Sequence, residues 1–309
     1  MWRIKWLTTL LWVVVVSSCI KPYDPVIETN DEKKYVVTGR ITDAEGFQEV
    51  HISLSSPVSA PAYRPVKDCY VSISDQSGKQ FVLSEAEDGI YRVWMEAADL
   101  KAGNVFSLSI TTPDGKQLQS GNDTLTESPQ IDSVYYFVEK LPTAVPGIVD
   151  KGARFCVDLD ATGSKSRYFK WEVTETWEYH AAHPVEFYYD GGFNAVIPPD
   201  FSNKKCWLTN EVKNVFTLST SSLSENTYRQ FPLHFVNGQT SRLGICYSIL
   251  VRQFSINEAA FEYWEKVRIN NQEQGGLYEK QPLAIKGNIR NLTDPGNEVL
   301  GFFYAAAVS

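Results

Sequence analysis

The sequence contains few groups of residues with the spacing that metal binding requires. His180 and His183 lie three residues apart, and Glu186 follows three residues later, so the set has the ligand types of a zinc site. On a helix this spacing would place the side chains on one face. Here a predicted strand ends at His180 and Pro184 follows, which favours a solvated loop. We therefore expect no metal site.

Acidic residues on a predicted strand suggest a second chemistry, glycosidic bond cleavage by two carboxylates. Glu172 and Glu178 share one face of a strand predicted around residues 168–180. Six strand residues place their carboxyl groups about 20 Å apart, whereas a pair acting on one bond lies less than about 10 Å apart. The common phosphate-binding, dinucleotide-binding and metalloprotease motifs are also missing from the sequence. We expect neither enzymatic activity nor a cofactor.

Aromatic residues are unusually dense between residues 168 and 193. Four of them alternate with polar residues along one strand and are predicted to fill a core: Phe169, Trp171, Trp177 and Tyr179. Tyr188 and Tyr189 differ, because consecutive strand residues point to opposite faces and cannot both enter one core. Together with Phe193, they are the candidate surface for a ligand or partner, since aromatic side chains anchor many interfaces.

The elements that position these residues are mostly strands. Short runs of alternating apolar and polar residues, separated by Gly, Asp and Pro turns, follow one another from residue 35 onward. They predict a mainly β chain with two β-sandwich domains of the immunoglobulin or fibronectin type, residues 35–125 and residues 130–309. The polar segment 119–130 marks the boundary between them.

One helix is predicted over residues 256–272, packed on the sheet of the second domain. Ser255 and Glu258 have the spacing of a capping box at its start. Apolar residues then repeat every three or four positions, which gives the helix one apolar face: Ile256, Ala260, Tyr263, Trp264 and Val267.

The N-terminus has the pattern of an export signal. Arg3 and Lys5 precede an apolar run over residues 6–16, which is too short to cross a hydrocarbon core of about 30 Å. The Val16-Ser17-Ser18-Cys19 segment resembles the lipobox of bacterial lipoproteins. This resemblance implies that residues 1–18 are a signal peptide, that Cys19 is acylated, and that residues 19–34 form a lipidated tether.

The net charge of the chain favours the acyl chains, rather than electrostatic attraction to anionic lipid, as the membrane anchor. The formal net charge is −8, and loss of Arg3 and Lys5 with the signal makes it more negative by two. An acidic chain with a pI near 5.2 does not suit nucleic acid or anionic lipid, which both need a concentrated basic surface.

Four of the five cysteines remain after lipidation, and an exported chain permits disulfides between them. Cys69 alternates with apolar residues and is predicted to be a buried free thiol. Cys156 and Cys246 fall on predicted outer faces of strands, which suggests that they are paired. Three full pairings are possible; we favour Cys156 bridged to Cys206 or to Cys246.

Several short motifs resemble a large family of Bacteroidota outer-membrane lipoproteins that contain a domain of unknown function. Genes of this family often lie beside those of TonB-dependent receptors. The motifs are Tyr23-Asp-Pro25, Val36-Val-Thr-Gly39, Tyr247-Ser-Ile-Leu-Val-Arg-Gln253, Gly275-Gly-Leu-Tyr278, Gly287-Asn288-Ile289 and Val299-Leu-Gly-Phe-Phe-Tyr-Ala305. The resemblance implies a lipid-anchored outer-membrane protein with a receptor or another envelope protein as its partner, and it carries over no catalytic residue.

These observations predict a non-enzymatic binding or accessory lipoprotein. The alternative is direct capture of a glycan or peptide by the region 185–201, and a hydrolase is a third possibility. The sequence leaves open whether the chain faces the periplasm or the cell surface.

Overall fold

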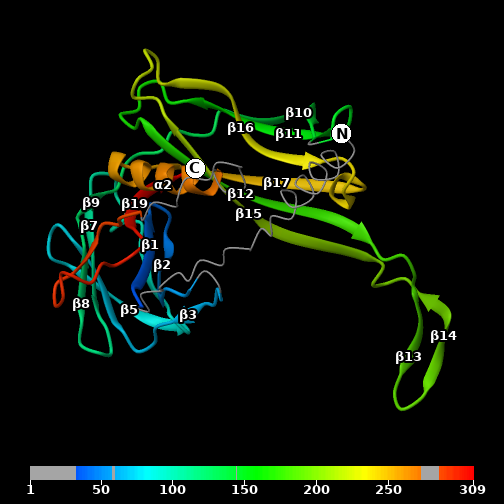
Figure 1. The fold of residues 1–309 in the computed structure, drawn as a ribbon, viewed down its shortest axis with the longest axis horizontal. Coiled ribbons are helices and arrows are strands. Elements are labelled where there is room, and N and C mark those ends of the chain that lie inside the picture. The colour runs from blue at the N-terminus through cyan, green and yellow to red at the C-terminus, as the bar shows by residue number, and fades with distance from the viewer. Residues whose placement is uncertain (1–32, 58–59, 144, 273–284) are drawn as a thin grey trace, which may run out of the picture.

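The computed structural model describes residues 33–57, 60–143, 145–272 and 285–309. In this part of the chain the protein consists mainly of β-strands, with one α-helix (Figure 1). The prediction of a mainly β chain is confirmed. The predicted signal peptide, Cys19 and nearly all of the tether lie outside the described residues.

The first unit is built from short strands in two facing layers. One layer has the order β19-β1-β2-β6 and the other the order β4-β7-β8-β18. β5 joins the layers, because its first half pairs with β4 and its second half with β6. The strands are β1 (Tyr35–Thr42), β2 (Gly46–Leu54), β3 (Arg64–Pro65), β4 (Tyr70–Asp75), β5 (Gln80–Glu87), β6 (Ile90–Met95), β7 (Val105–Thr111), β8 (Gln117–Ser120), β9 (Asp123–Thr124), β18 (Ile289–Asn291) and β19 (Phe303–Val308).

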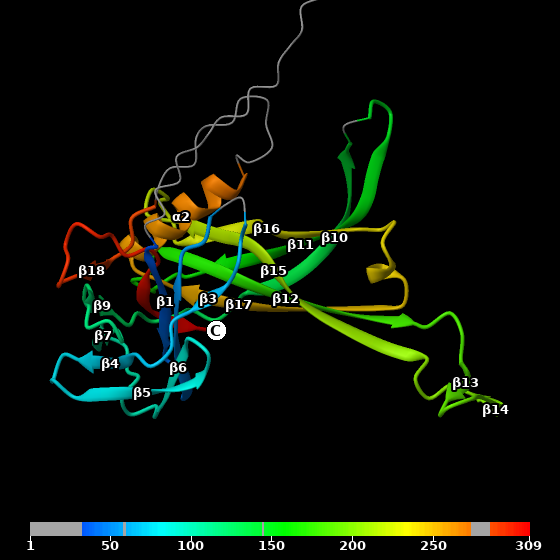
Figure 2. The ribbon, with the colours of Figure 1, turned by 60° about the horizontal axis from the view of Figure 1, so that its bottom comes forward.

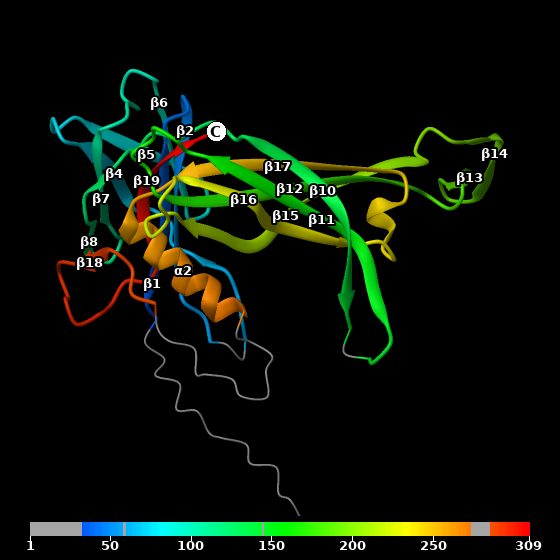
Figure 3. The same cartoon turned by 90° about the horizontal axis from the view of Figure 1, so that it is seen from above.

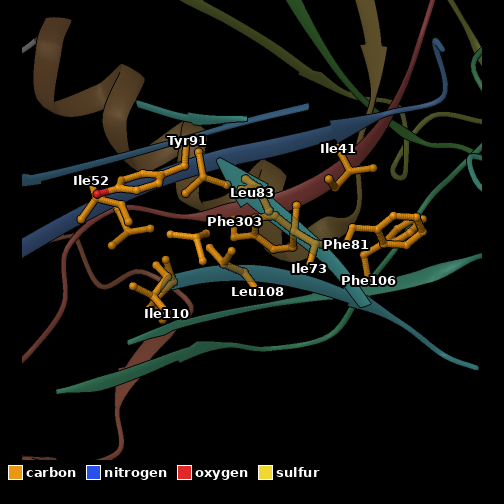
Figure 4. Close-up of a cluster of buried hydrophobic side chains, with 14 of the residues drawn as sticks. Ile41, Ile52, Ile73, Phe81, Leu83, Tyr91, Phe106, Leu108, Ile110 and Phe303 are labelled. Atoms are coloured by element: carbon orange, nitrogen blue, oxygen red, sulfur yellow. The ribbon is translucent and has the colours of Figure 1, made fainter. Parts of the chain in front are cut away.

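A hydrophobic core fills the space between these layers (Figure 4). Along β1 every second residue is buried, as expected for a strand with one face on a core and the other outside. Ile41 and Ile52 enter the core from one layer, and Ile73 and Leu108 enter it from the other. The alternation of apolar and polar residues in the sequence therefore matches this packing, with the apolar residues facing the core.

The C-terminal segment returns to the first unit. β18 pairs with β8, and β19 runs parallel to β1. Phe303 is fully buried in the first core. The side-chain amide of Asn288 donates a hydrogen bond to the Phe303 carbonyl (2.6 Å) and accepts one from the Phe303 N–H (2.9 Å). The predicted second domain, residues 130–309, therefore differs from the structure at its end. Local periodicity cannot reveal a strand pairing between residues more than 260 positions apart.

The second unit also has two facing sheets, one with the order β10-β11-β16 and one with the order β15-β12-β17. Trp171 lies between them, with its ring 4.6 Å from that of Phe231 and its indole N–H bonded to Gln253 (3.1 Å). The strands are β10 (Ser133–Pro142), β11 (Val149–Asp160), β12 (Tyr168–His180), β13 (Val185–Tyr189), β14 (Phe193–Asp200), β15 (Lys205–Ser219), β16 (Thr227–Asn237) and β17 (Cys246–Ser255), and a short 3₁₀ helix η1 (Ser241–Leu243) precedes β17.

The two units are joined by backbone hydrogen bonding. β17 pairs with β19 through Phe254–Val308 and Ser255–Ala307, so one 14-stranded sheet runs through both units. The prediction of two domains treated them as consecutive segments. In the structure they share a sheet, because the last strand of the chain lies between strands of both units.

The helix α2 (Glu258–Gln272) packs over the junction of the two units (Figure 3). Tyr263 stacks on Phe302 (4.8 Å between ring centroids), and Trp264 lies edge-on to Tyr304 (6.1 Å). The predicted helix is confirmed, but the predicted capping box is wrong. Ser255 is the last residue of β17, three residues before the helix begins, and its hydroxyl has no hydrogen-bond partner among the described residues.

Candidate functional site: an exposed aromatic arm

The most prominent feature of the second unit is a long arm that projects from the body (Figures 1 and 2). Its base is formed by β12 and β15, which pair along most of their length from Tyr168–Ser219 out to His180–Lys205. Its tip is the two-stranded ribbon β13–β14. Among the described residues these two tip strands pair only with each other, so the tip has no second layer.

All three residues of the predicted binding surface lie at this tip and are exposed. The exposed fraction is 52% for Tyr188, 70% for Tyr189 and 84% for Phe193. The rings of Tyr189 and Phe193 pack edge to face, 5.4 Å apart, because the two residues are direct cross-strand partners. As predicted for consecutive strand residues, Tyr188 points to the opposite face from Tyr189.

The tip ribbon has one apolar face. Phe187 pairs with Ala195 two positions from the Tyr189–Phe193 pair, so these side chains share a face. Phe187 is 60% exposed and Ile197, further along β14, is 87% exposed. Contiguous exposed apolar patches are uncommon on soluble monomers, so this face is the candidate interaction surface of the tip.

Further apolar side chains are exposed near the base of the arm. Trp207 and Leu208 on β15 are exposed, and so is Tyr179 near the end of β12, at 39%. Tyr179 was predicted to lie in the core together with Phe169, Trp171 and Trp177. The structure confirms burial of the other three, whereas Tyr179, closest to the outer end of β12, is exposed.

The histidines near the base are not brought together around an ion. His180 bonds Glu178 on its own strand (2.8 Å), and Lys205 contacts the same carboxylate (3.1 Å). No cluster of three or more metal-ligating side chains occurs among the described residues.

The cysteines do not form the predicted disulfide. Cys69, Cys156, Cys206 and Cys246 are free thiols in the structure. Cys206 and Cys246 lie on the two strands that flank β12, with that strand between them. Cys156 is buried although it shares a face of β11 with the half-buried Arg154 and Asp158, and burial raises the pKa of its thiol.

A buried polar cluster lies within the second unit, around a glutamate at an apolar position of β12. Glu175 falls on the apolar parity of β12 and is 4% exposed. Its carboxylate accepts from Tyr247 (2.8 Å) and Arg242 (3.2 Å), and His234 lies 3.3 Å away. Burial lowers the pKa of His234, which keeps its ring neutral. The cluster fixes η1 and β17 onto β12.

An apolar cavity of about 570 Å³ opens beside this cluster, between the β10–β11 hairpin and η1. Its wall is a row of three rings, in which Phe155 contacts both Tyr136 (5.7 Å) and Tyr247 (5.3 Å). Of the cluster, only Tyr247 lines the cavity. The cavity can hold an apolar group, but its lining provides no acid–base pair.

In the described part of the chain, no helix is long and apolar enough to span a bilayer. No curated protein matches the sequence. A family model does match, and it covers residues 20–309, from the residue after the predicted lipidation site Cys19 onward. The chain therefore belongs to the family defined by the domain of unknown function DUF4249.

Proposed function

We propose that this protein is a non-enzymatic outer-membrane lipoprotein that binds a protein of the envelope through the tip of its aromatic arm. The observation that carries the proposal is the exposed apolar face of β13–β14, where Tyr189, Phe193 and Ile197 stand in solvent. Such rings anchor interfaces because each buries a large area at little cost in rotamer entropy. The choice of a TonB-dependent receptor as the partner rests on the family resemblance.

The layered arrangement of both units supports a scaffold for this arm. We assign the two units to immunoglobulin- or fibronectin-like sandwiches, on the basis of their short strands in facing layers with cores between them. In such a scaffold a rigid body presents one projecting element, which suits docking rather than catalysis.

The first prediction concerns lipid anchoring. Replacement of Cys19 by serine is expected to move the protein from the membrane fraction to the soluble fraction, because the acyl chains cannot attach. Fractionation of cells, followed by detection of the protein in each fraction, measures this. Recovery of the Cys19→Ser protein in the outer membrane at the wild-type level would contradict lipid anchoring. Proteolysis of intact cells then shows whether the body faces the outside.

The second prediction concerns binding of the partner protein. The triple variant Tyr188→Ser, Tyr189→Ser and Phe193→Ser should reduce the amount of receptor that co-purifies after mild detergent extraction by at least tenfold. Its folding should be unchanged, since these side chains are exposed and make few contacts with the body. Quantitative mass spectrometry of the co-purified proteins is the measurement.

The matched control replaces exposed tyrosines of the first unit, Tyr63→Ser and Tyr70→Ser, whose exposed fractions are 62% and 55%. This variant removes similar apolar surface at a distance from the arm and should retain the partner. Equal loss in both variants, or equal retention in both, would show that the arm tip is not the docking surface.

Capture of a glycan or peptide by the arm is the second candidate function. The edge-to-face pair of Tyr189 and Phe193 favours it, because an exposed pair of rings can stack against a sugar or an apolar side chain. A glycan and peptide array probed with the wild-type protein and the triple variant separates the two functions. Arm-dependent array binding without a co-purified protein supports capture.

A further inference from the structure

A cleft of about 570 Å³ lies at the junction of the two units, on the side covered by α2. The outer faces of β1 and β2 form one wall, and β12, β17, β19 and α2 form the other. A second cavity of about 460 Å³ adjoins it and shares Arg40, Glu172, Arg252 and Trp264. Ligand sites often lie at such junctions, where two units supply different side chains.

Three cations share one carboxylate where the two cavities adjoin: Arg40 and Arg252 line both, and Lys170 lines the second. Arg40 and Lys170 hold Glu172 Oε1 at 2.5 and 2.6 Å, and Arg252 lies 3.7 Å from Glu172 Oε2. No other acidic side chain forms an ion pair with them among the described residues. The cluster therefore keeps two positive charges without a matching anion.

The remaining charged groups of the two cavities supply only part of that anion. Glu49, the cross-strand partner of Arg40 on β2, also faces the junction cleft, where it lies 3.7 Å from His51 and forms no ion pair with the three cations. Glu211 and Lys213, both on the exposed part of β15, bring one charge of each sign to the neighbouring cavity. The positive cluster is thus local, within a chain whose net charge is −8.

Trp264 adds a donor without an acceptor. Its ring lines both cavities, and Lys170 Nζ lies 4.6 Å from its centroid. The indole N–H is buried and has no hydrogen-bond partner among the described residues. A buried donor left unpaired costs free energy, so this N–H is an unsatisfied polar group beside the positive cluster.

We propose that the junction cleft binds a small ligand that carries an oxyanion, a carboxylate or a phosphate, on an apolar body. Arg252 is the residue that binds the oxyanion. It is the loosest of the three cations, with a side chain 42% exposed, so its guanidinium can turn from Glu172 to a bidentate ligand contact. The apolar body would lie against Phe47, Phe302 and Val308.

Calorimetric titration of the mature full-length protein tests this proposal. The probes are phenyl phosphate and benzoate, which separate the two oxyanions, and benzyl alcohol, which has the ring without the charge. At least one of the two anions should bind, at least tenfold more tightly than benzyl alcohol. The Arg252→Gln variant should bind that anion at least tenfold more weakly, and Arg252→Lys should fall between the two, because lysine keeps the charge but not the planar fork.

The matched control is Arg290→Gln, which removes an exposed arginine on β18 outside both cavities and should bind like the wild type. Thermal unfolding midpoints of all variants show that they are folded. Absence of binding by both anions, equal binding of benzyl alcohol, or wild-type affinity in Arg252→Gln would each overturn the proposal. The result is independent of the arm, because the triple arm variant should bind the same anion unchanged.

Discussion

Replacement of Gly301 by alanine is expected to lower the free energy of unfolding by more than about 3 kcal/mol. Gly301 has φ of +95°, and a Cβ added there would overlap the carbonyl oxygen of Val37 on β1. The chain cannot move aside, because both neighbours bond β1: the Leu300 carbonyl accepts from Val37 (2.8 Å) and the Phe302 carbonyl from Gly39 (3.2 Å). Urea unfolding followed by tryptophan fluorescence measures the change.

Gly296→Ala is the control for this prediction. It lies in the same C-terminal segment without a positive φ, and its added Cβ would meet its nearest neighbour, Asp294, at an ordinary 3.6 Å. A loss of less than about 0.5 kcal/mol is expected there. If Gly301→Ala were as stable as Gly296→Ala, the parallel approach of β19 to β1 would be wrong. The C-terminal segment would then not complete the first core.

Replacement of Glu172 by glutamine is expected to cost about 3–5 kcal/mol at pH 7. Lys170 is nearly buried, with a side chain 6% exposed, and Arg40 is 25% exposed, and this carboxylate is the ion-pair partner of both. Arg40 comes from β1 and Glu172 from β12, so the ion pair also joins the two units. Loss of the anion leaves three cations, Arg40, Lys170 and Arg252, close together without their shared ion-pair partner.

The dependence on pH provides a second measurement of the same interaction. Burial alone would raise the pKa of Glu172, but the charges of Lys170 and Arg40 outweigh it and lower the pKa to about 2. A lowered pKa in the folded state stabilises the protein above the unfolded-state pKa of about 4.3, and this contribution is lost as the pH falls toward 2. The difference in stability between wild type and Glu172→Gln should therefore shrink by about 3 kcal/mol between pH 6 and pH 2.

Glu262→Gln on α2 is the control. Its carboxylate is exposed and lies 4.0 Å from Lys266, so its loss should change stability by less than about 0.5 kcal/mol at either pH. A constant gap between wild type and Glu172→Gln across this range would show that Glu172 is not held ionised by the two cations.

Local patterns predicted the elements well. The alternation in β12 placed Phe169 and Trp171 in the core, and three- and four-residue spacing predicted α2. The same alternation failed for Tyr179 and Cys156, in opposite directions. Tyr179 is exposed near the outer end of β12, and Cys156 is buried in the middle of its sheet, where β11 is paired on both sides by β10 and β16. Burial on a strand depends on the length and position of its neighbours, which the strand itself does not encode.

The two candidate sites also differ in whether a local sequence pattern predicts them. The sequence predicted the exposed pair Tyr188 and Tyr189 because consecutive strand residues face opposite sides, which is a local rule. It did not predict the junction cleft, whose Arg40 and Arg252 are 212 positions apart in the sequence. The Glu172 carboxylate was recognised as part of a charged outer face, but its partner on β1 was not.

The sequence by itself determined the mainly β class, the position of the helix, the lipobox pattern at Cys19 and the aromatic residues of the arm tip, because each follows from residues close together in the chain. Only the tertiary structure decided that β19 inserts between β1 and β17, that the two units share a sheet, and that three cations meet at Glu172. These features depend on pairings between distant strands, and their free energy comes from contacts that form only when the whole sheet assembles.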